Sequence, residues 1–111
     1  VIAAETDREA RRLLTSLQQQ FVNLRRGRPG PLNAPVDSLD GFWSPAEKAG
    51  VEHALACAVV GAPDTVRQGL KAIIDRTGAN ELILTAQIFD HATRLRSFEI
   101  AAGARDQLAA A

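Results

Sequence analysis

Three residues that follow apolar runs of the sequence are the best placed to bind a ligand. Thr85 comes directly after the apolar run 82–84 and Gln87 two residues later, and Gly61 follows the apolar run 58–60. A hydroxyl and an amide can hydrogen-bond a cofactor or a substrate, although such groups often cap the turn from a strand into a helix. Gly61 precedes an expected helix whose N-terminus favours anions. We predict Gly61, Thr85 and Gln87 as candidate cofactor-binding residues, and the sequence assigns no catalytic residue.

The other reactive side chains do not form a recognisable cluster. His53 and Cys57 lie four residues apart, and nothing in the sequence brings His91 to them. Zinc needs three or four ligands, so we predict no metal site, a buried Cys57 thiol and a partly exposed His53. Asp90 and His91 are neighbours, and neighbours on a helix point to different faces. Asp90 is therefore expected to cap a helix rather than to form an acid–base pair.

The stretch "RGRP", residues 26–29, resembles the core of an AT-hook, which places arginines in the minor groove of DNA. The chain has 13 Lys and Arg against 13 Asp and Glu, so its formal net charge is zero. Without a wider basic patch, a helix end with solvated arginines is the better interpretation. We expect no nucleic-acid partner.

Composition places the chain among globular proteins. It has 111 residues, of which 46% are hydrophobic and 23% charged, enough for the core of one domain. No apolar run reaches the length of a membrane span, and a single cysteine favours a reducing compartment, so we expect a cytoplasmic protein without a membrane partner. There is no methionine and the chain starts at Val1. We therefore expect 1–111 to be a single partial domain of a longer protein.

Strand-like and helical stretches alternate along the chain. Three stretches that contain an unbroken apolar run are typical of parallel strands, namely residues 1–4, 58–61 and 82–86. Caps and apolar periodicity predict helices from Thr6 to near Arg26, from Ser44, from Pro63 to Thr77 and from Asp90. This order predicts an α/β fold with right-handed crossovers. Helices on both faces would indicate a doubly wound sheet, and helices on one face a segment of a (β/α)₈ barrel.

Apolar spacing also predicts which side chains are buried. The first helix should bury one stripe and turn Gln18, Gln19 and its arginines mostly to the other side. The irregular stretch 27–43 is expected to be a surface loop insertion held to the core by Phe42 and Trp43. The stripe of the first helix comprises Ala10, Leu13, Leu14, Leu17, Phe21 and Leu24, and the last helix is expected to bury Leu95, Phe98 and Ala102.

An ordered set of stretches carries a family resemblance: "LQQQFVNLRRGRPGPL", "WSPAEKAGVEHAL", "VVGAPDTVRQGL", "RTGANELILT" and "IFDHATRLRSFEIAA". In this order they resemble the C-terminal part of luciferase-like flavin-dependent monooxygenases, in particular the bacterial-luciferase-like group of single-component type. The resemblance implies the C-terminal part of a (β/α)₈ barrel, with residues 1–4, 58–61 and 82–86 as the sixth, seventh and eighth strands. It also implies reduced FMN, or the deazaflavin F420, which with O₂ oxidises a small organic substrate.

Two departures from the family pattern matter. Ala62 stands where the family usually has a serine or threonine cap, which should cost about 1 kcal/mol of helix stability. The first strands of a barrel are absent, and in the family they carry most flavin contacts and the usual catalytic residues. We therefore expect no activity and no tight flavin binding by the isolated chain. The alternative is a non-catalytic α/β module whose open sheet self-associates as a homodimer through a bare edge.

Overall fold

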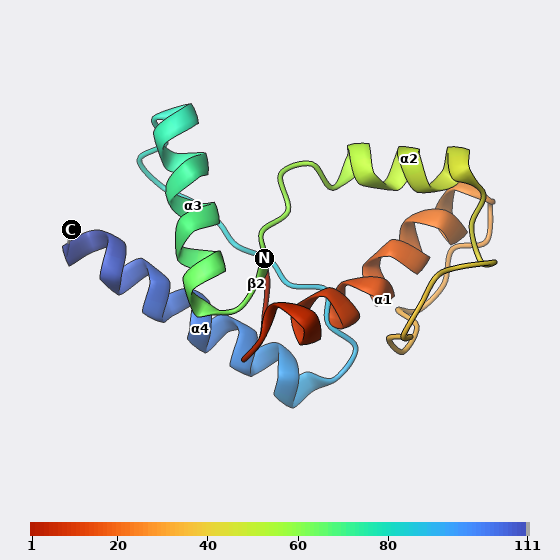
Figure 1. Ribbon diagram of the computed structural model, residues 1–111, viewed down its shortest axis with the longest axis horizontal. Coiled ribbons are helices and arrows are strands. Elements are labelled where there is room, and N and C mark those ends of the chain that lie inside the picture. The colour runs from red at the N-terminus through yellow and green to blue at the C-terminus, as the bar shows by residue number, and fades with distance from the viewer. Residues whose placement is uncertain (111) are drawn as a thin grey trace.

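The computed structural model describes residues 1–110 and, within them, contains four helices and two short strands (Figure 1). Their order is β1 (Ile2–Ala3), α1 (Asp7–Arg25), α2 (Pro45–Ala54), β2 (Val60–Gly61), α3 (Pro63–Thr77) and α4 (His91–Ala110). The predicted α/β alternation is present, and helix limits lie within about two residues of those expected from caps.

The two strands form a parallel pair at the centre of the molecule. Ile2 lies opposite Val60 and Ala3 opposite Gly61. The N–H of Ile2 donates to the carbonyl of Val59 at 2.8 Å, and the N–H of Ala4 donates to that of Gly61 at 3.1 Å. Parallel pairing of the first two predicted strands is therefore confirmed.

The third predicted strand is not formed. Residues 82–86 belong to a connection without helix or strand between α3 and α4. A strand needs a ladder of backbone bonds, yet no backbone N–H of residues 81–88 donates a hydrogen bond within residues 1–110. The prediction of about three parallel strands is thus wrong for this structure, which has two.

The connection lies beside β1 rather than beside β2. Because the N–H groups of Ile2 and Ala4 face β2, those of Val1 and Ala3 face the opposite edge of β1. There the Val1 nitrogen donates to the Thr85 carbonyl at 2.8 Å, and the Ala3 N–H donates to Ser97 Oγ at 2.9 Å. The resemblance implies that 82–86 is the eighth strand of a barrel, which would lie next to the seventh, β2. The structure instead places this stretch beside β1, so that expectation is wrong here.

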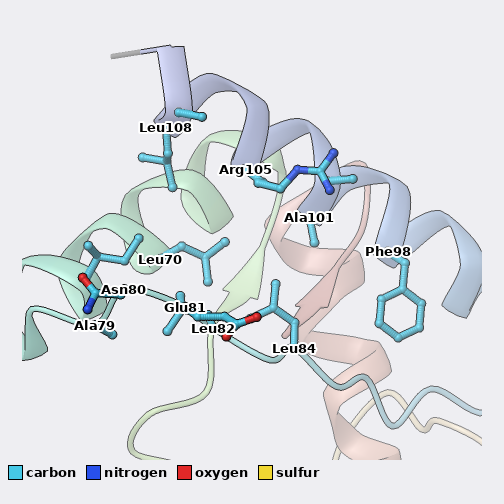
Figure 2. Close-up of a pocket in the computed structure, with 13 residues that line it drawn as sticks. Leu70, Ala79, Asn80, Glu81, Leu82, Leu84, Phe98, Ala101, Arg105 and Leu108 are labelled. Atoms are coloured by element: carbon cyan, nitrogen blue, oxygen red, sulfur yellow. The ribbon is translucent and has the colours of Figure 1, made fainter.

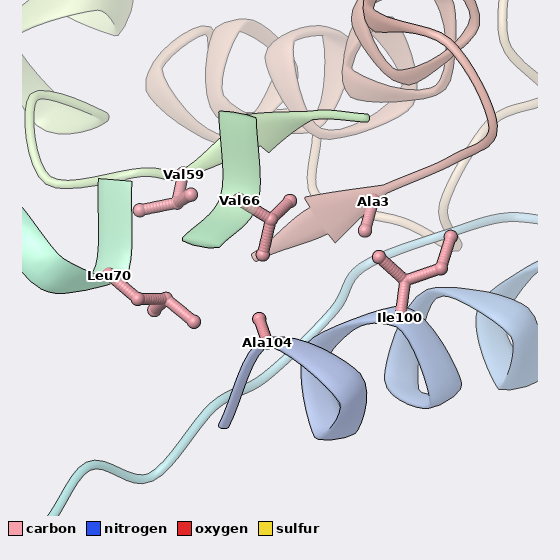
Figure 3. Packing of buried hydrophobic residues seen from close by; sticks show 6 residues of the cluster. All are labelled: Ala3, Val59, Val66, Leu70, Ile100 and Ala104. Carbon is pink, nitrogen blue, oxygen red and sulfur yellow. The ribbon is translucent and has the colours of Figure 1, made fainter. Parts of the chain in front are cut away.

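Helices cover both faces of the small sheet. On one face Ala3 and Val59 pack against α3 and α4 (Figure 3), in a cluster that also contains Val66, Leu70, Ile100 and Ala104. On the other face Ile2 and Ala4 pack against α1 and the connection, through Ala10, Leu13 and Ile88. Helices therefore lie on both sides of this pair of strands.

The loop 27–43 covers a side of α1 that was expected to face solvent. Gln19 is buried and its Nε2 donates to the Ala34 carbonyl at 3.1 Å. Thr15 Oγ1 accepts from the N–H of Val36 at 2.9 Å, and Leu39 rather than Phe42 or Trp43 is the buried anchor of the loop. Leu24, predicted to be buried, is 58% exposed, because α1 is rotated toward the loop.

Caps and one close approach fix the middle of the chain. Ser44 and Glu47 form a complete capping box at the start of α2. Gly78 ends α3 in the left-handed conformation at φ 67°, as predicted. A Cβ at Gly69 would stand 2.7 Å from Val59 Cγ1, so glycine there allows α3 to pack closely against Val59, the residue before β2.

Helix α4 is rotated relative to the prediction. Its buried side chains are Ser97, Ile100, Ala101 and Ala104, which follow helical spacing. Leu95 is 49% and Phe98 is 40% exposed, so the expected burial of this stripe is wrong. The small residues face the sheet because Ser97 must reach the free N–H of Ala3, and that contact leaves the larger side chains outside.

Candidate functional site

The carboxyl ends of β1 and β2 are joined by Asp7. Its Oδ1 accepts from the N–H of Ala62 at 2.7 Å. This bond, helped by the Thr65 hydroxyl, lowers the pKa of Asp7. A Cβ at Gly61 would stand 2.5 Å from Thr65 Cγ2 and 2.6 Å from Asp7 Oδ1, so the junction requires glycine. We call Asp7, Gly61, Ala62 and Thr65 the strand-end junction.

The junction explains how α3 begins without its own cap. Ala62 occupies the cap position and makes no side-chain hydrogen bond. The carboxylate of Asp7 instead lies at the positive end of α3, where a negative charge is favourable. Sequence reasoning missed Asp7 and Thr65. An acidic residue in the first turn of the helix after β1 was visible, but its contact across 55 residues was not.

A small cavity adjoins the end of β1. It has a volume of about 290 Å³ and is lined by Ala3, Ala4, Glu5, Glu9, Ala92, Thr93 and Arg96. Arg96 Nε donates to Glu5 Oε1 at 2.6 Å and Arg96 Nη1 to Glu99 Oε2 at 3.1 Å. The hydrogen bond from Arg96 lowers the pKa of Glu5. These charged groups satisfy one another, which is the arrangement of a structural ion pair.

Thr85 and Gln87 lie away from Gly61. The Thr85 carbonyl accepts from Val1, which places it at the beginning of β1 rather than at its carboxyl end. Gln87 is exposed and lines a different cavity of about 350 Å³ beside the second half of α1, together with Leu17, Gln20, Phe21, Leu24, Pro29, Gly30 and Leu55. The structure therefore does not bring the three predicted residues together.

The residues present do not form a flavin site by themselves. The phosphate of FMN needs several donors in one place, but the N–H of Ala62 is already bound to Asp7. Thr85 lies at the beginning of β1, where its carbonyl accepts from Val1, and Gln87 lines a cavity that does not include Gly61.

The remaining reactive side chains are placed as isolated groups. Cys57 is exposed, against the prediction of a buried thiol, and its Sγ lies 3.7 Å from Arg76 Nη2. Asp90 caps α4 by accepting from the N–H of Thr93 at 2.9 Å. Within residues 1–110 there is no group of three or more metal-ligating side chains. In the same part of the chain no helix combines the length and apolar character that a membrane crossing requires.

Arg26 of the "RGRP" stretch is bound within the protein. Its Nε donates to Glu47 Oε2 at 2.6 Å and its Nη2 to Glu47 Oε1 at 2.8 Å. Its guanidinium also stacks 5.0 Å from the centre of the Phe42 ring. The hydrogen bonds from Arg26 lower the pKa of Glu47 to about 2. This ion pair joins the end of α1 to the start of α2.

An apolar groove lies between α3 and α4 (Figure 2). It has a volume of about 630 Å³, and the segment 79–84 forms its third wall. Leu70, Leu82, Leu84 and Phe98 are among its apolar lining residues, and Glu81 and Arg105 carry its charges. Such a groove holds apolar surface and offers few directed polar contacts.

The chain is similar to proteins known as luciferase-like monooxygenases, although no family model matches it. It is 47% identical over 108 residues to a luciferase-like monooxygenase of Escherichia coli (strain K12). The aligned region covers 97% of this chain and 32% of that protein. It is 43% identical over 102 residues to the uncharacterized protein YvbT of Bacillus subtilis (strain 168), covering 92% of this chain and 30% of YvbT.

A solved structure supports the same relation. The crystal structure of apo-MsnO8 matches with a TM-score of 0.67 at 28% identity, covering 95% of this chain and 32% of that one. The chain therefore spans about a third of the length of the curated relatives that it matches. The resemblance to luciferase-like monooxygenases is confirmed for such a segment.

Proposed function

We propose that this chain is the C-terminal segment of a luciferase-like flavin-dependent monooxygenase with a (β/α)₈ barrel. Such an oxidoreductase uses reduced FMN, or the deazaflavin F420, and O₂ to oxidise a small organic substrate. One observation carries the proposal: almost the whole chain is 47% identical to a protein called a luciferase-like monooxygenase, yet it matches only 32% of that protein.

The isolated segment is inactive under this proposal. Oxygen chemistry belongs to the flavin, and the protein must bind and orient it. The described residues lack a convergent set of donors, because Gly61 is packed against Asp7 and Thr65 while Gln87 lies in a separate cavity. The remainder of the polypeptide supplies the missing flavin contacts, and Gly61, Thr85 and Gln87 add to them in the completed protein.

The test compares two proteins under anaerobic conditions. One is the chain 1–111, and the other joins it to the part of the E. coli relative that it does not match. We expect the joined protein to retain reduced FMN or reduced F420 through gel filtration and the chain alone to retain neither. Stoichiometric binding by the chain alone, or a folded joined protein that binds neither flavin, would overturn the proposal.

Side-chain variants of the joined protein test the three candidate residues. We expect Thr85→Ala and Gln87→Ala each to weaken reduced-flavin binding about tenfold, the effect of losing one hydrogen bond. Thr77→Ala is the matched control, since its hydroxyl binds the Ile73 carbonyl within α3. Equal affinity in all three variants would remove Thr85 and Gln87 from the flavin site.

A non-catalytic module that self-associates is the second candidate function. It is favoured by the outer edge of β2, which has no strand partner within residues 1–110. Analytical ultracentrifugation of the chain separates the two candidates. A stable dimer with a cooperative melt favours the module, and a monomer favours the enzyme segment.

A further inference from the structure

We infer that a cavity between the first half of α1 and loop 27–43 is a binding site for a small ligand that carries a diphosphate group. The guanidinium groups of Arg8, Arg11 and Arg12 bind its phosphates. None of the three candidate flavin residues lines this cavity, so the inference goes beyond the proposed function. It rests on the shape, the charge and the ion pairing of the described residues.

The shape of the site comes from one face of α1. The cavity has a volume of about 610 Å³, which lies in the range of small-molecule sites. Arg8, Arg11, Arg12 and Thr15 line it, and residues three or four apart on a helix are neighbours on one face. Asp37 lines it from loop 27–43. The helix and the loop therefore form two walls of one cavity.

Positive charge exceeds negative charge in this cavity. Its lining contains three arginines but only two carboxylates, those of Glu9 and Asp37. The chain as a whole has a formal net charge of zero. The start of α1 is also the positive end of its helix dipole. A local excess of positive charge in a neutral protein favours an anionic ligand.

The contact between Arg12 and Asp37 shows how an anion is held here. Arg12 Nε donates to Asp37 Oδ1 at 2.8 Å. This hydrogen bond, with a further contribution from the charge of Arg8, lowers the pKa of Asp37. The Arg12 and Asp37 side chains are 48% and 91% exposed, and ion pairs this exposed are weak. A more highly charged anion can therefore take the place of the Asp37 carboxylate.

Arg8 and Arg11 supply donors that the described chain does not use. Both are exposed, and neither lies within ion-pair distance of a carboxylate in residues 1–110. A guanidinium group presents a planar fork of N–H donors that matches the oxygens of a phosphate. Three such groups on neighbouring positions of a helix engage two linked phosphates more fully than one.

The lining also indicates which part of the ligand is recognised. Of the described residues that line the cavity, none is aromatic, so stacking on a nucleotide base does not contribute. The polar groups available are guanidinium groups, the Thr15 hydroxyl and the two carboxylates. The phosphates of the ligand, rather than an attached ring, are the feature that this site binds.

Isothermal titration calorimetry of the chain 1–111 at low ionic strength tests the site, with inorganic pyrophosphate and inorganic phosphate as the probes. We expect pyrophosphate to bind 1:1 and at least about tenfold more tightly than phosphate, because it engages more of the arginines. Affinity should fall as salt is added, since the groups are exposed. No binding of pyrophosphate, or equal affinity for both probes, would overturn the inference.

Arginine variants show whether these residues form the site. We expect Arg8→Gln and Arg11→Gln each to weaken pyrophosphate binding about tenfold, the effect of losing a charged hydrogen-bonding group. Arg28→Gln is the matched control, because Arg28 is exposed and does not line the cavity. An equal loss in Arg28→Gln would mean that only net charge matters, and the inference would be wrong.

An aspartate variant gives a test in the opposite direction. Asp37→Asn removes the carboxylate that pyrophosphate must displace from Arg12, so we expect affinity to rise at least about threefold. Asp40→Asn is the control, since Asp40 is an exposed residue of the same loop outside the cavity. Weaker binding by Asp37→Asn, or the same gain in both variants, would contradict the inference.

Two further probes identify the source of the phosphates. Binding of ADP as tight as that of pyrophosphate supports a diphosphate ester as the ligand, and tight binding of pyrophosphate alone supports the free diphosphate. Duplex DNA that displaces pyrophosphate at equal phosphate concentration would indicate a nucleic-acid backbone instead and overturn the inference. None of these titrations involves a flavin, so this site and the proposed function can fail separately.

Discussion

Residues 1–78 and residues 79–110 differ in how many of their hydrogen-bonding groups and apolar side chains find partners within the described chain. In the first region, α1 and α2 carry side-chain caps, and Asp7 accepts a hydrogen bond at the start of α3. The loop 27–43 is held to α1 because Thr15 accepts from the N–H of Val36 and Gln19 donates to the carbonyl of Ala34. In the second region, the connection 81–88 donates no backbone hydrogen bond within residues 1–110, and Ile83, Leu95 and Phe98 are exposed. The first region thus forms its caps and loop contacts internally, whereas the second leaves backbone N–H groups and apolar side chains without partners in residues 1–110.

The largest expected difference in stability is between two leucine truncations, one in each region. Leu70 is 3% exposed in the cluster between β1, α3 and α4, so Leu70→Ala should destabilise the chain by about 3 kcal/mol through lost contacts and a cavity. Leu95 is 49% exposed, and Leu95→Ala should change stability by less than about 0.5 kcal/mol. Urea denaturation followed by circular dichroism measures both, and equal losses would contradict the comparison.

Gly61→Ala should have the next largest effect. The added Cβ would meet Thr65 and Asp7 at 2.5 and 2.6 Å, so the strand-end junction must open, at a cost of about 2 kcal/mol. Gly30→Ala is the control, because nothing lies within 4 Å of its Cβ position. Thermal melts of the two variants should differ by several degrees, and coincident melts would show that the junction is loose.

Two helix-cap substitutions should change stability by smaller amounts and in opposite directions. Ser44→Ala removes a complete capping box and should cost about 1 kcal/mol. Ala62→Ser adds a cap where α3 has none of its own and should stabilise by about 0.5 kcal/mol, less than usual since Asp7 already lies there. Denaturation midpoints measure both changes. A full 1 kcal/mol gain from Ala62→Ser would mean that Asp7 does not serve α3.

The smallest effect is the pH dependence from Glu47. Its pKa is about 2 in the folded chain, below the ordinary value of 4.5, because Arg26 hydrogen-bonds the carboxylate. The carboxylate therefore stabilises the folded state fully above pH 4.5, and this contribution is lost as the pH falls toward 2. Stability measured between pH 5 and 2.5 should fall less steeply in Glu47→Gln than in the wild type. Parallel curves would contradict this role.

Local signals in the sequence predicted most helix limits. Thr6, Ser44 and Gly78 act within one turn of their own position, so a cap or a left-handed glycine is recognisable without the fold. The parallel pairing of the first two strands followed from the alternation of strands and helices. The caps depend on neighbours in sequence, and the pairing depends on the order of the elements along the chain.

Features that depend on distant partners were not predictable. The stretch 82–86 has strand composition, but strand formation needs a neighbour that residues 1–110 do not supply. Gln19 is polar, yet it is buried by a loop whose path the periodicity of α1 does not specify. The same holds for the candidate site, where Gly61 lies at a strand end as expected while Asp7 joins it from another element.

The hydrogen bonds that hold loop 27–43 to α1 determine where the chain can accept an insertion. Arg12, Thr15 and Gln19, on successive turns of α1, hold the second half of the loop through Asp37, Val36 and Ala34. A protease needs an extended, freely adaptable stretch, so cleavage should be slow between 34 and 39. The exposed stretch Pro29–Pro31 is outside these ties. A peptide tag or a fluorescent reporter inserted there would leave the strand-end junction and the surface of α4 in place.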